Sequence, residues 1–198
     1  MTLPNQLTIL RIILSPIFLF FFLSDIIWMK QVSVAIYIVA ALSDWYDGWL
    51  ARKFNYITSW GKFWDPLADK ILTSVAFIGF AIVELIPWWM VIIIVGRDVV
   101  ITLLRVFADM KNYAFTTSYY AKWKTLLQMV FLYYLLILYV AQFTPEIFNG
   151  NENLITALLN EQLIFFIALL ITAITFHSGI LYISRNWKII TKLLKIEN

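Results

Sequence analysis

Cysteine is absent from the 198 residues, and histidine occurs once, at His177. Without cysteine the chain can form no disulfide, no thiolate metal site and no cysteine nucleophile, and a single histidine excludes a histidine-rich metal site. Charged residues make up only 14% of the chain. No Gly/Ser linker, internal repeat or low-complexity tract divides the sequence. We therefore interpret residues 1–198 as a single domain.

Apolar residues dominate instead. They make up 62% of the sequence, and the mean hydropathy is +0.82, well above that of a water-soluble domain. A membrane-spanning helix needs about 20 apolar residues, and only a helix satisfies its own backbone groups in lipid. The sequence predicts an all-α, polytopic membrane protein with six transmembrane helices. We place them at residues 7–24, 32–50, 65–86, 88–108, 122–143 and 161–183.

Lysine and arginine are distributed unevenly over the connections between these segments. They occur between the second and third segments, between the fourth and fifth, and after the sixth, whereas ELIPWW and AQFTPEIFNGNENLITALLNEQ contain none. By the positive-inside rule the basic set is cytoplasmic, so both termini are predicted to be cytoplasmic. Lys30, in the first outer turn, is the exception. The net charge of +3 then indicates attraction to anionic lipid rather than to nucleic acid.

Four aspartates stand close together beside the second and third apolar segments. On a helix of about 100° per residue, Asp44 and Asp47 share a face with the small residues Gly48 and Ala51. The other two carboxylates are four residues apart and also share a face. The complete set is Asp44, Asp47, Asp65 and Asp69.

Four negative charges at low dielectric need compensating cations. Oxygen ligands without nearby histidine or cysteine select Mg²⁺, Mn²⁺ or Ca²⁺, and four carboxylates suit two divalent ions about 4 Å apart, an arrangement that clamps phosphoryl groups. Gly48, Ala51 and Gly61 would leave space for such a group, and Arg52 could pair with it.

Turn chemistry offers a different interpretation of the same residues. Asp47-Gly48 could end a helix, and Asp65 could cap a helix that begins at Pro66, in which case Gly61 would leave the shared face. Arg52 could be an ordinary cytoplasmic anchor, as could Lys53 and Lys62.

The spacing resembles the signature of the CDP-alcohol phosphotransferases, D-x2-D-G-x2-A-R-x8-G-x3-D-x3-D, and matches each of its fixed positions between Asp44 and Asp69. The resemblance implies six transmembrane helices, a homodimer, two divalent cations (Mg²⁺ or Mn²⁺) and attack of an alcohol on the β-phosphorus of a CDP-linked lipid. By carry-over, all four aspartates are metal ligands and Asp69 is also the general base. The implied CDP-binding residues within the signature are Gly48, Ala51, Arg52 and Gly61.

Other segments resemble the bacterial phosphatidylglycerophosphate synthases of this family. LPNQLTILRI is similar to their amino-terminal segment and adds Asn5 and Thr8 to the implied CDP site; GRDVVITLLR and AKWKT are similar to their Arg and Lys-x-Lys-Thr elements. Ala121 and Asp98 depart from the common Gly and Glu. The implied location is the bacterial plasma membrane, with the active site facing the cytoplasm.

The acceptor depends on residues outside the signature. Arg105, Lys122 and Lys124 can converge at the depth of the aspartates, and three cations that metal-bound carboxylates do not require indicate an anionic co-substrate. With CDP-diacylglycerol as donor, sn-glycerol 3-phosphate is the natural candidate. Inositol phosphate, phosphatidylglycerol and serine stay as alternatives, and cytoplasmic anchoring is the structural alternative for these cations.

Three further polar residues in the apolar segments have mainly structural interpretations. Charged residues deep in a span usually pair inside the bundle, so we expect Arg97 and Asp98 to have a structural role below the site. His177 is expected to be an interior hydrogen-bonding residue.

A small cation transporter is the alternative function from a different class of protein. A transporter would place the carboxylates near the bilayer midplane, without Arg52 beside them.

Overall fold

The computed structural model describes residues 3–54, 59–111, 113, 115–116 and 119–195. Within its helices, the side chains at 3–4, 45, 47–48, 50–52, 54, 59–60, 62 and 194–195 lie outside the described set. The sequence-based assignments for the side chains of Asp47, Gly48, Ala51 and Arg52 therefore fall outside the described residues.

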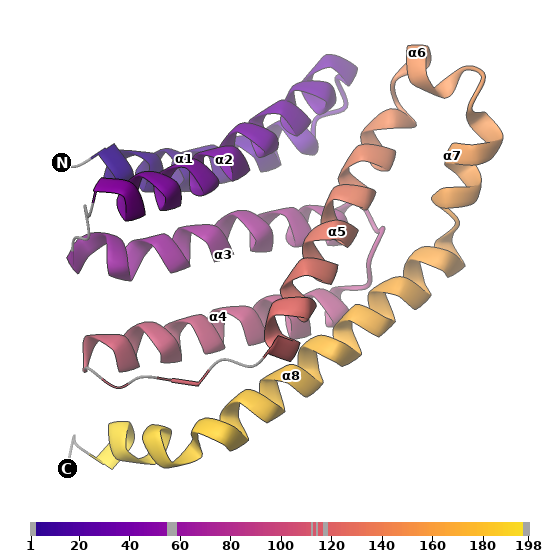
Figure 1. Ribbon diagram of the computed structural model, residues 1–198. Coiled ribbons are helices and arrows are strands. Elements are labelled where there is room, and N and C mark those ends of the chain that lie inside the picture. The colour runs from indigo at the N-terminus through magenta and orange to yellow at the C-terminus, as the bar shows by residue number, and fades with distance from the viewer. Residues whose placement is uncertain (1–2, 55–58, 112, 114, 117–118, 196–198) are drawn as a thin grey trace.

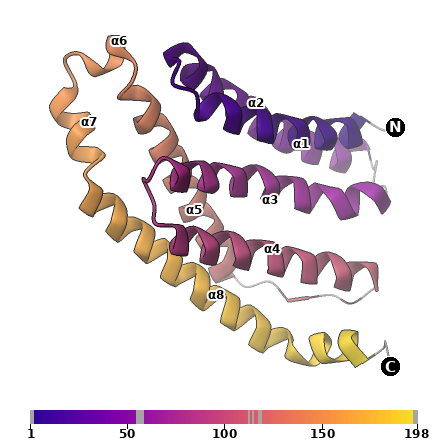
Figure 2. The same cartoon turned by 180° about the vertical axis from the view of Figure 1, so that it is seen from behind.

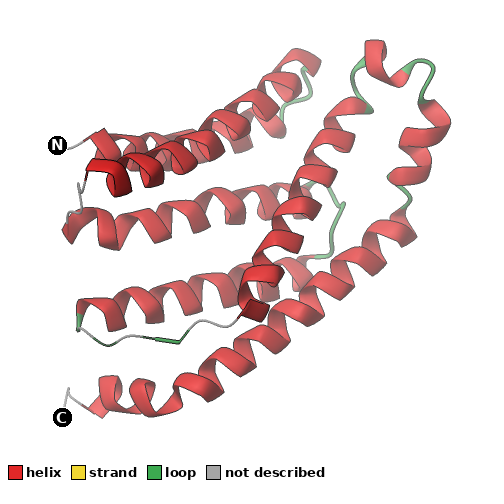
Figure 3. Cartoon of the chain, viewed as in Figure 1, coloured by secondary structure: helices red, strands yellow, loops and turns green. Residues whose placement is uncertain are grey.

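The described chain is entirely helical and contains no strand (Figure 3), so the predicted all-α class is confirmed. Six helices are long and two, α6 and α7, are short. Their bounds are α1 Leu3–Phe22, α2 Ile27–Phe54, α3 Ser59–Ile82, α4 Trp88–Met110, α5 Tyr119–Ala141, α6 Pro145–Phe148, α7 Glu152–Leu158 and α8 Glu161–Lys195.

The first four helices lie side by side, and α5 and α8 cross them obliquely (Figures 1 and 2). In sequence order, α1 packs on α2 and α3, α3 packs on α4, and α4 packs on α8. Several helix ends lie together on the left in Figure 1: the start of α1, the end of α2, the start of α3, the end of α4 and the end of α8. The start of α1 and the end of α8 therefore lie on the same side of the bundle, and their cytoplasmic location stays a prediction.

Four helical stretches are long and apolar enough to cross a membrane: Asn5–Phe22, Ile27–Asp44, Tyr119–Ala141 and Glu152–Leu193. The other two long helices, α3 and α4, each contain four charged residues. These residues are Lys62, Asp65, Asp69 and Lys70 in α3, and Arg97, Asp98, Arg105 and Asp109 in α4. The chain is a polytopic membrane protein in which these two helices pack against each other.

Neither turn interpretation of the aspartate stretch agrees with the helix bounds. Helix α2 continues through Asp47-Gly48 to Phe54, and α3 begins at Ser59, six residues before the predicted span, with Pro66 inside it. Pro66 removes one backbone donor from the helix but does not end it. Gly61 is therefore on the same helix as Asp65 and Asp69, at intervals of four residues, so all three share one face.

Aromatic side chains join the first three packed helices to α5 in the centre of the bundle. The Phe22 ring of α1 lies 5.6 Å from that of Phe80 in α3 and 5.0 Å from that of Tyr139 in α5, measured between centroids. A Cβ at Gly79 would lie 3.1 Å from a methyl carbon of Leu19. Glycine at this position therefore permits the close approach of α1 and α3.

Lys30, the exception to the charge rule, lies in α2 rather than in a turn, and it is buried. Its ammonium donates a hydrogen bond to the Tyr139 hydroxyl at 3.3 Å and lies 4.3 Å from the centroid of the Phe143 ring. A cation over an aromatic face is stabilised by the ring quadrupole. Lys30 therefore connects α2 to the end of α5, which accounts for a lysine on the side predicted to be outer.

The chain has no native cysteine, so its topology can be tested with single introduced ones. We expect Asn153→Cys, in the exposed first turn of α7, to react with a membrane-impermeant maleimide in intact cells. Lys111→Cys, exposed after α4, should react only after permeabilisation. Labelling of both positions from outside would contradict the predicted sidedness.

Candidate active site

Helix α1 supplies partners to the carboxylates of α2 and α3. The buried Arg11 guanidinium is 2.6 Å from Asp44, and the buried Thr8 hydroxyl donates a hydrogen bond to Asp65, also at 2.6 Å. Thr8 and Arg11 are three residues apart and so share one face of α1. The sequence analysis assigned Thr8 to the nucleotide and gave Arg11 no role, although a lone arginine in an apolar span indicates a buried partner.

Three of the four predicted metal ligands have described side chains, and they gather at the adjoining ends of α2 and α3. The carboxylates of Asp65 and Asp69 are close enough to that of Asp44 to interact with it electrostatically. Asp69 also pairs with Lys70 at 3.1 Å. Among described side chains no group of three carboxylates is close enough to hold one ion, and Asp47 is outside that set.

The remaining residues assigned to CDP are only partly described. Asn5 lies in the first turns of α1, half-buried, and Gly61 is buried in the first turn of α3. The starts of α1 and α3 lie on the same side of the bundle (Figure 1).

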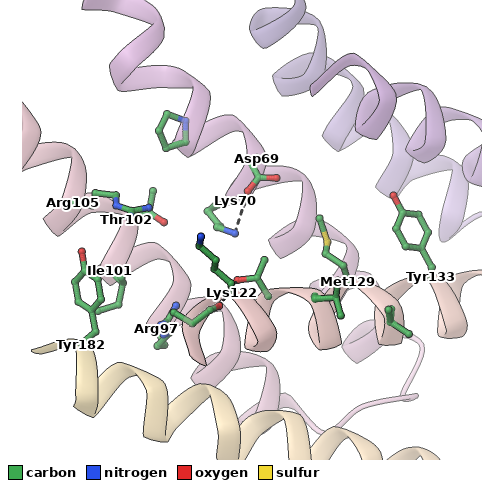
Figure 4. Close-up of a pocket in the computed structure, with 15 residues that line it drawn as sticks. Asp69, Lys70, Arg97, Ile101, Thr102, Arg105, Lys122, Met129, Tyr133 and Tyr182 are labelled. Atoms are coloured by element: carbon green, nitrogen blue, oxygen red, sulfur yellow. Dashed lines mark hydrogen bonds and ion pairs between the residues drawn. The ribbon is translucent and has the colours of Figure 1, made fainter. Parts of the chain in front are cut away.

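A cavity of about 720 Å³ opens beside Asp69, between α3, α4, α5 and α8 (Figure 4). Four cationic side chains line it together with the single carboxylate of Asp69: Lys70, Arg97, Arg105 and Lys122. Thr102, Thr125, Tyr133 and Tyr182 add hydroxyl groups. The lining thus brings together Asp69, Arg105 and Lys122 of the predicted site, and it adds Lys70, Arg97 and Tyr182, which the sequence analysis did not assign to it.

Lys124 is not among the residues that line this cavity. It is buried, and its ammonium lies 2.5 Å from Oδ1 of Asp98, an oxygen that Arg97 also contacts at 3.0 Å. Asp98 therefore forms the interior pairs expected for a charge deep in a span. Arg97 takes part in both groups: it pairs with Asp98, and its side chain also lines the cavity.

His177 makes the expected hydrogen bond but is not interior. Its Nδ1 lies 3.2 Å from the Tyr120 hydroxyl, and the side chain is exposed on α8. The expectation of an interior position is wrong because the exposed face of a membrane helix is as apolar as its buried face, so hydropathy does not separate them.

A cavity with one carboxylate and four cations can bind an anionic substrate and accept a proton from it. Its apolar lining, which includes Ile101, Leu126, Met129 and Val130, suits an amphipathic molecule. Leu126 and Val130 are 53% and 60% exposed, so the cavity is open beside these apolar residues.

Comparison with known proteins agrees with this chemistry. A family model for CDP-alcohol phosphatidyltransferase matches residues 1–174. A protein of Bacillus subtilis is 33% identical over 94% of this chain and 95% of its own length. Proteins of Salmonella paratyphi A and Escherichia coli are 37% and 36% identical, each over 67% of this chain and 75% of their own length.

The chain belongs to the CDP-alcohol phosphatidyltransferase family and is a membrane-bound transferase. All three relatives carry the name CDP-diacylglycerol–glycerol-3-phosphate 3-phosphatidyltransferase. The family suggested by the aspartate spacing is thereby confirmed.

The buried contacts of Asp98 predict a large effect on stability. Asp98→Asn would leave Lys124 buried without its counter-charge, so we expect the free energy of unfolding to fall by about 3 kcal/mol. Thermal unfolding of the purified protein in detergent measures the change. Asp109→Asn, an exposed carboxylate on the same helix, is the matched control; equal effects of the two substitutions would contradict the structural role of Asp98.

Proposed function

We propose that the protein transfers the phosphatidyl group of CDP-diacylglycerol to sn-glycerol 3-phosphate, giving phosphatidylglycerophosphate and CMP. The family and the names of its relatives support the reaction type and both substrates. The observation that carries the choice of acceptor is the excess of cations in the cavity next to Asp69. A phosphomonoester carries the negative charge that such a lining stabilises, whereas serine is zwitterionic.

In this proposal the two substrates approach Asp69 from different sides. The carboxylate end of the site lies against α1, α2 and α3, where Asn5, Thr8, Gly48, Ala51, Arg52 and Gly61 would hold the CDP group. The cationic end lies between α4, α5 and α8, where Arg105 and Lys122 would bind the acceptor phosphate, joined by Lys70 and Arg97. Asp69 stands between the two ends, as it lines the cavity and also interacts with Asp44.

Lys124 was predicted to bind the acceptor phosphate, and we now propose an indirect role for it. Since its ammonium pairs with Asp98 below the cavity, we propose that it acts on the acceptor indirectly, by holding Asp98 and thereby Arg97. Lys122, two residues earlier on α5, lines the cavity itself.

The donor chemistry of the aspartates fits divalent cations. Their ligands are carboxylate oxygens, which suit Mg²⁺ or Mn²⁺, and Asp44 already has a positive charge beside it, the guanidinium of Arg11 at 2.6 Å. Asp44, Asp47, Asp65 and Asp69 would hold two such ions. When bound, the ions would neutralise the pyrophosphate and stabilise charge on the phosphoryl oxygens.

Asp69 would act as the general base. The terminal hydroxyl oxygen of glycerol 3-phosphate forms a bond to the β-phosphorus, the bond from that phosphorus to the CMP oxygen breaks, and CMP leaves with the electron pair. The hydroxyl proton goes to Asp69, whose carboxylate Lys70 contacts at 3.1 Å. An ionised carboxylate is the form able to accept a proton.

The cellular setting follows from the topology and the family. We propose a single domain, residues 1–198, in the bacterial plasma membrane as a homodimer, with the site open to the cytoplasm. The acyl chains of the donor would remain in the bilayer next to the exposed apolar residues Leu126 and Val130, which also line the cavity.

An acceptor assay tests the function. Purified protein with CDP-diacylglycerol and Mg²⁺ or Mn²⁺ should release CMP when glycerol 3-phosphate is added. Inositol phosphate, serine and phosphatidylglycerol, each offered separately, should give little. CMP release with serine or phosphatidylglycerol but not with glycerol 3-phosphate would show that the proposed acceptor is wrong, while the proposed reaction type would be correct.

The role of Asp69 predicts a selective loss of turnover. Asp69→Asn removes the proton acceptor with almost no change in shape, so kcat should fall by at least about 100-fold. Binding of CDP-diacylglycerol, measured by calorimetry, should be largely retained. Asp25→Asn, an exposed carboxylate at the start of the α1–α2 turn, is the control, and substantial residual turnover of Asp69→Asn would exclude Asp69 as the base.

A further inference from the structure

Helix α8 extends well beyond the part of the chain that the family model matches. The match ends at residue 174, whereas α8 continues to Lys195 and runs beside α4 (Figure 1). Three residues of this extension, Gly179, Tyr182 and Asn186, have spacings of three and four and therefore share one face. We call them the α8 face; Gly179 and Tyr182 contact the cationic end of the site, and Asn186 contacts the α4–α5 connection.

Gly179 lies against Arg97. A Cβ at this position would be 3.1 Å from Cγ of Arg97 and 3.8 Å from its Nε. The absence of a side chain on α8 therefore lets the Arg97 chain pass over the helix on its way to the cavity. Any larger residue at 179 has to displace Arg97, because 3.1 Å is shorter than an ordinary carbon–carbon contact.

Tyr182 forms the wall of the cavity on the α8 side. Its side chain is only 6% exposed and lines the cavity. Arg105 is near enough to interact with it electrostatically, and Figure 4 shows the ring standing beside Arg105 and Ile101. The ring also packs edge-on against Phe115 of the α4–α5 connection, 5.6 Å between centroids.

Asn186 holds the same connection one turn further along. Its side-chain oxygen accepts hydrogen bonds from the Thr116 backbone N–H at 3.1 Å and from the Thr116 hydroxyl at 3.3 Å. Its side-chain N–H₂ group donates to the Tyr182 carbonyl at 2.9 Å. The residue is 1% exposed, and its side-chain oxygen joins α8 to the connection that precedes α5 and Lys122.

We propose that the α8 face selects the anionic acceptor by positioning the cations of the site. Gly179 sets the path of Arg97, Tyr182 bounds the space beside Arg105, and Asn186 fixes the connection that precedes Lys122. All three are positioning residues, because they act through the cations rather than on the reacting atoms. The proposal rests on the proposed function, since it assigns these cations to the acceptor.

Acceptor selection depends on the placement of such groups more than on their number. A displacement of a fraction of an ångström weakens charge-assisted hydrogen bonds, which are directional, and a misplaced substrate reacts more slowly. Among the described residues, α8 packs mainly on α4 and α5, whereas the carboxylate end lies against α1, α2 and α3. Changes on that face should therefore affect the acceptor and leave the CDP-lipid largely unaffected.

Matched substitutions separate this role from general damage. Gly179→Ala places a methyl group against Arg97, whereas Gly96→Ala, on α4 beside Arg97, adds the same group where nothing lies within 4 Å. Alanine favours a helix over glycine at both positions, so both variants should fold. Asn186→Ala removes the connection to Thr116, and Ser184→Ala, an exposed residue of the same helix, is its control.

CMP release is measured with glycerol 3-phosphate varied at saturating CDP-diacylglycerol, and then with the two substrates exchanged. We expect Gly179→Ala and Asn186→Ala to raise KM for glycerol 3-phosphate about fivefold or more, the order expected from a weakened charge-assisted contact. KM for CDP-diacylglycerol should stay within about twofold, and both controls should behave as the wild type.

Three results would overturn the proposal: an unchanged KM for glycerol 3-phosphate in Gly179→Ala, parallel changes in both KM values, or changes that accompany a lowered thermal unfolding midpoint in Gly179→Ala. Failure of the wild type to use glycerol 3-phosphate would instead refute the proposed function. In that event, the affinity of the wild type and of Gly179→Ala for glycerol 3-phosphate is measured by calorimetry. The inference predicts weaker binding by Gly179→Ala, and equal affinities would reject it.

Discussion

Charges buried among apolar helices need partners, and this constraint organises the whole site. Arg11 pairs with Asp44, Thr8 donates to Asp65, and Asp98 lies between Lys124 and Arg97. Each contact joins side chains of different helices except that of the neighbours Arg97 and Asp98. An unpaired ion at this depth costs several kcal/mol, so these pairs favour one arrangement of the helices over others of similar apolar packing.

The pairs also divide the site into two ends of opposite charge. Carboxylates gather where α1, α2 and α3 meet, and cations gather where α3, α4, α5 and α8 surround the cavity, with Asp69 and Lys70 in contact at the boundary. A donor that carries a pyrophosphate and an acceptor that carries a phosphate can thus approach the same carboxylate without competing for the same cations. Helices α3 and α4 pack against each other, and both line the cavity at this boundary.

Much of the fold could be predicted from apolar runs, because a long run of apolar residues in lipid can only be a helix. The ends of the helices were predicted less well. Asp65-Pro66 and Asp47-Gly48 have the local chemistry of caps and turns, yet α3 starts at Ser59 and α2 continues to Phe54. Helix α8 is longer than the predicted 161–183 because its last turns pack on the α4–α5 connection through Asn186, a contact that hydropathy does not register.

The sequence by itself determined the membrane class, the helical fold and the family, because composition and the spacing of the aspartates are local properties along one or two helices. Only the tertiary structure decided which charge meets which. Lys122 and Lys124 are two residues apart on one helix, and so they point about 160° apart; one lines the cavity and the other pairs with Asp98. Arg11 and Tyr182 are far in sequence from the residues they contact. Such contacts depend on how helix faces pack against one another, and no local pattern specifies that packing.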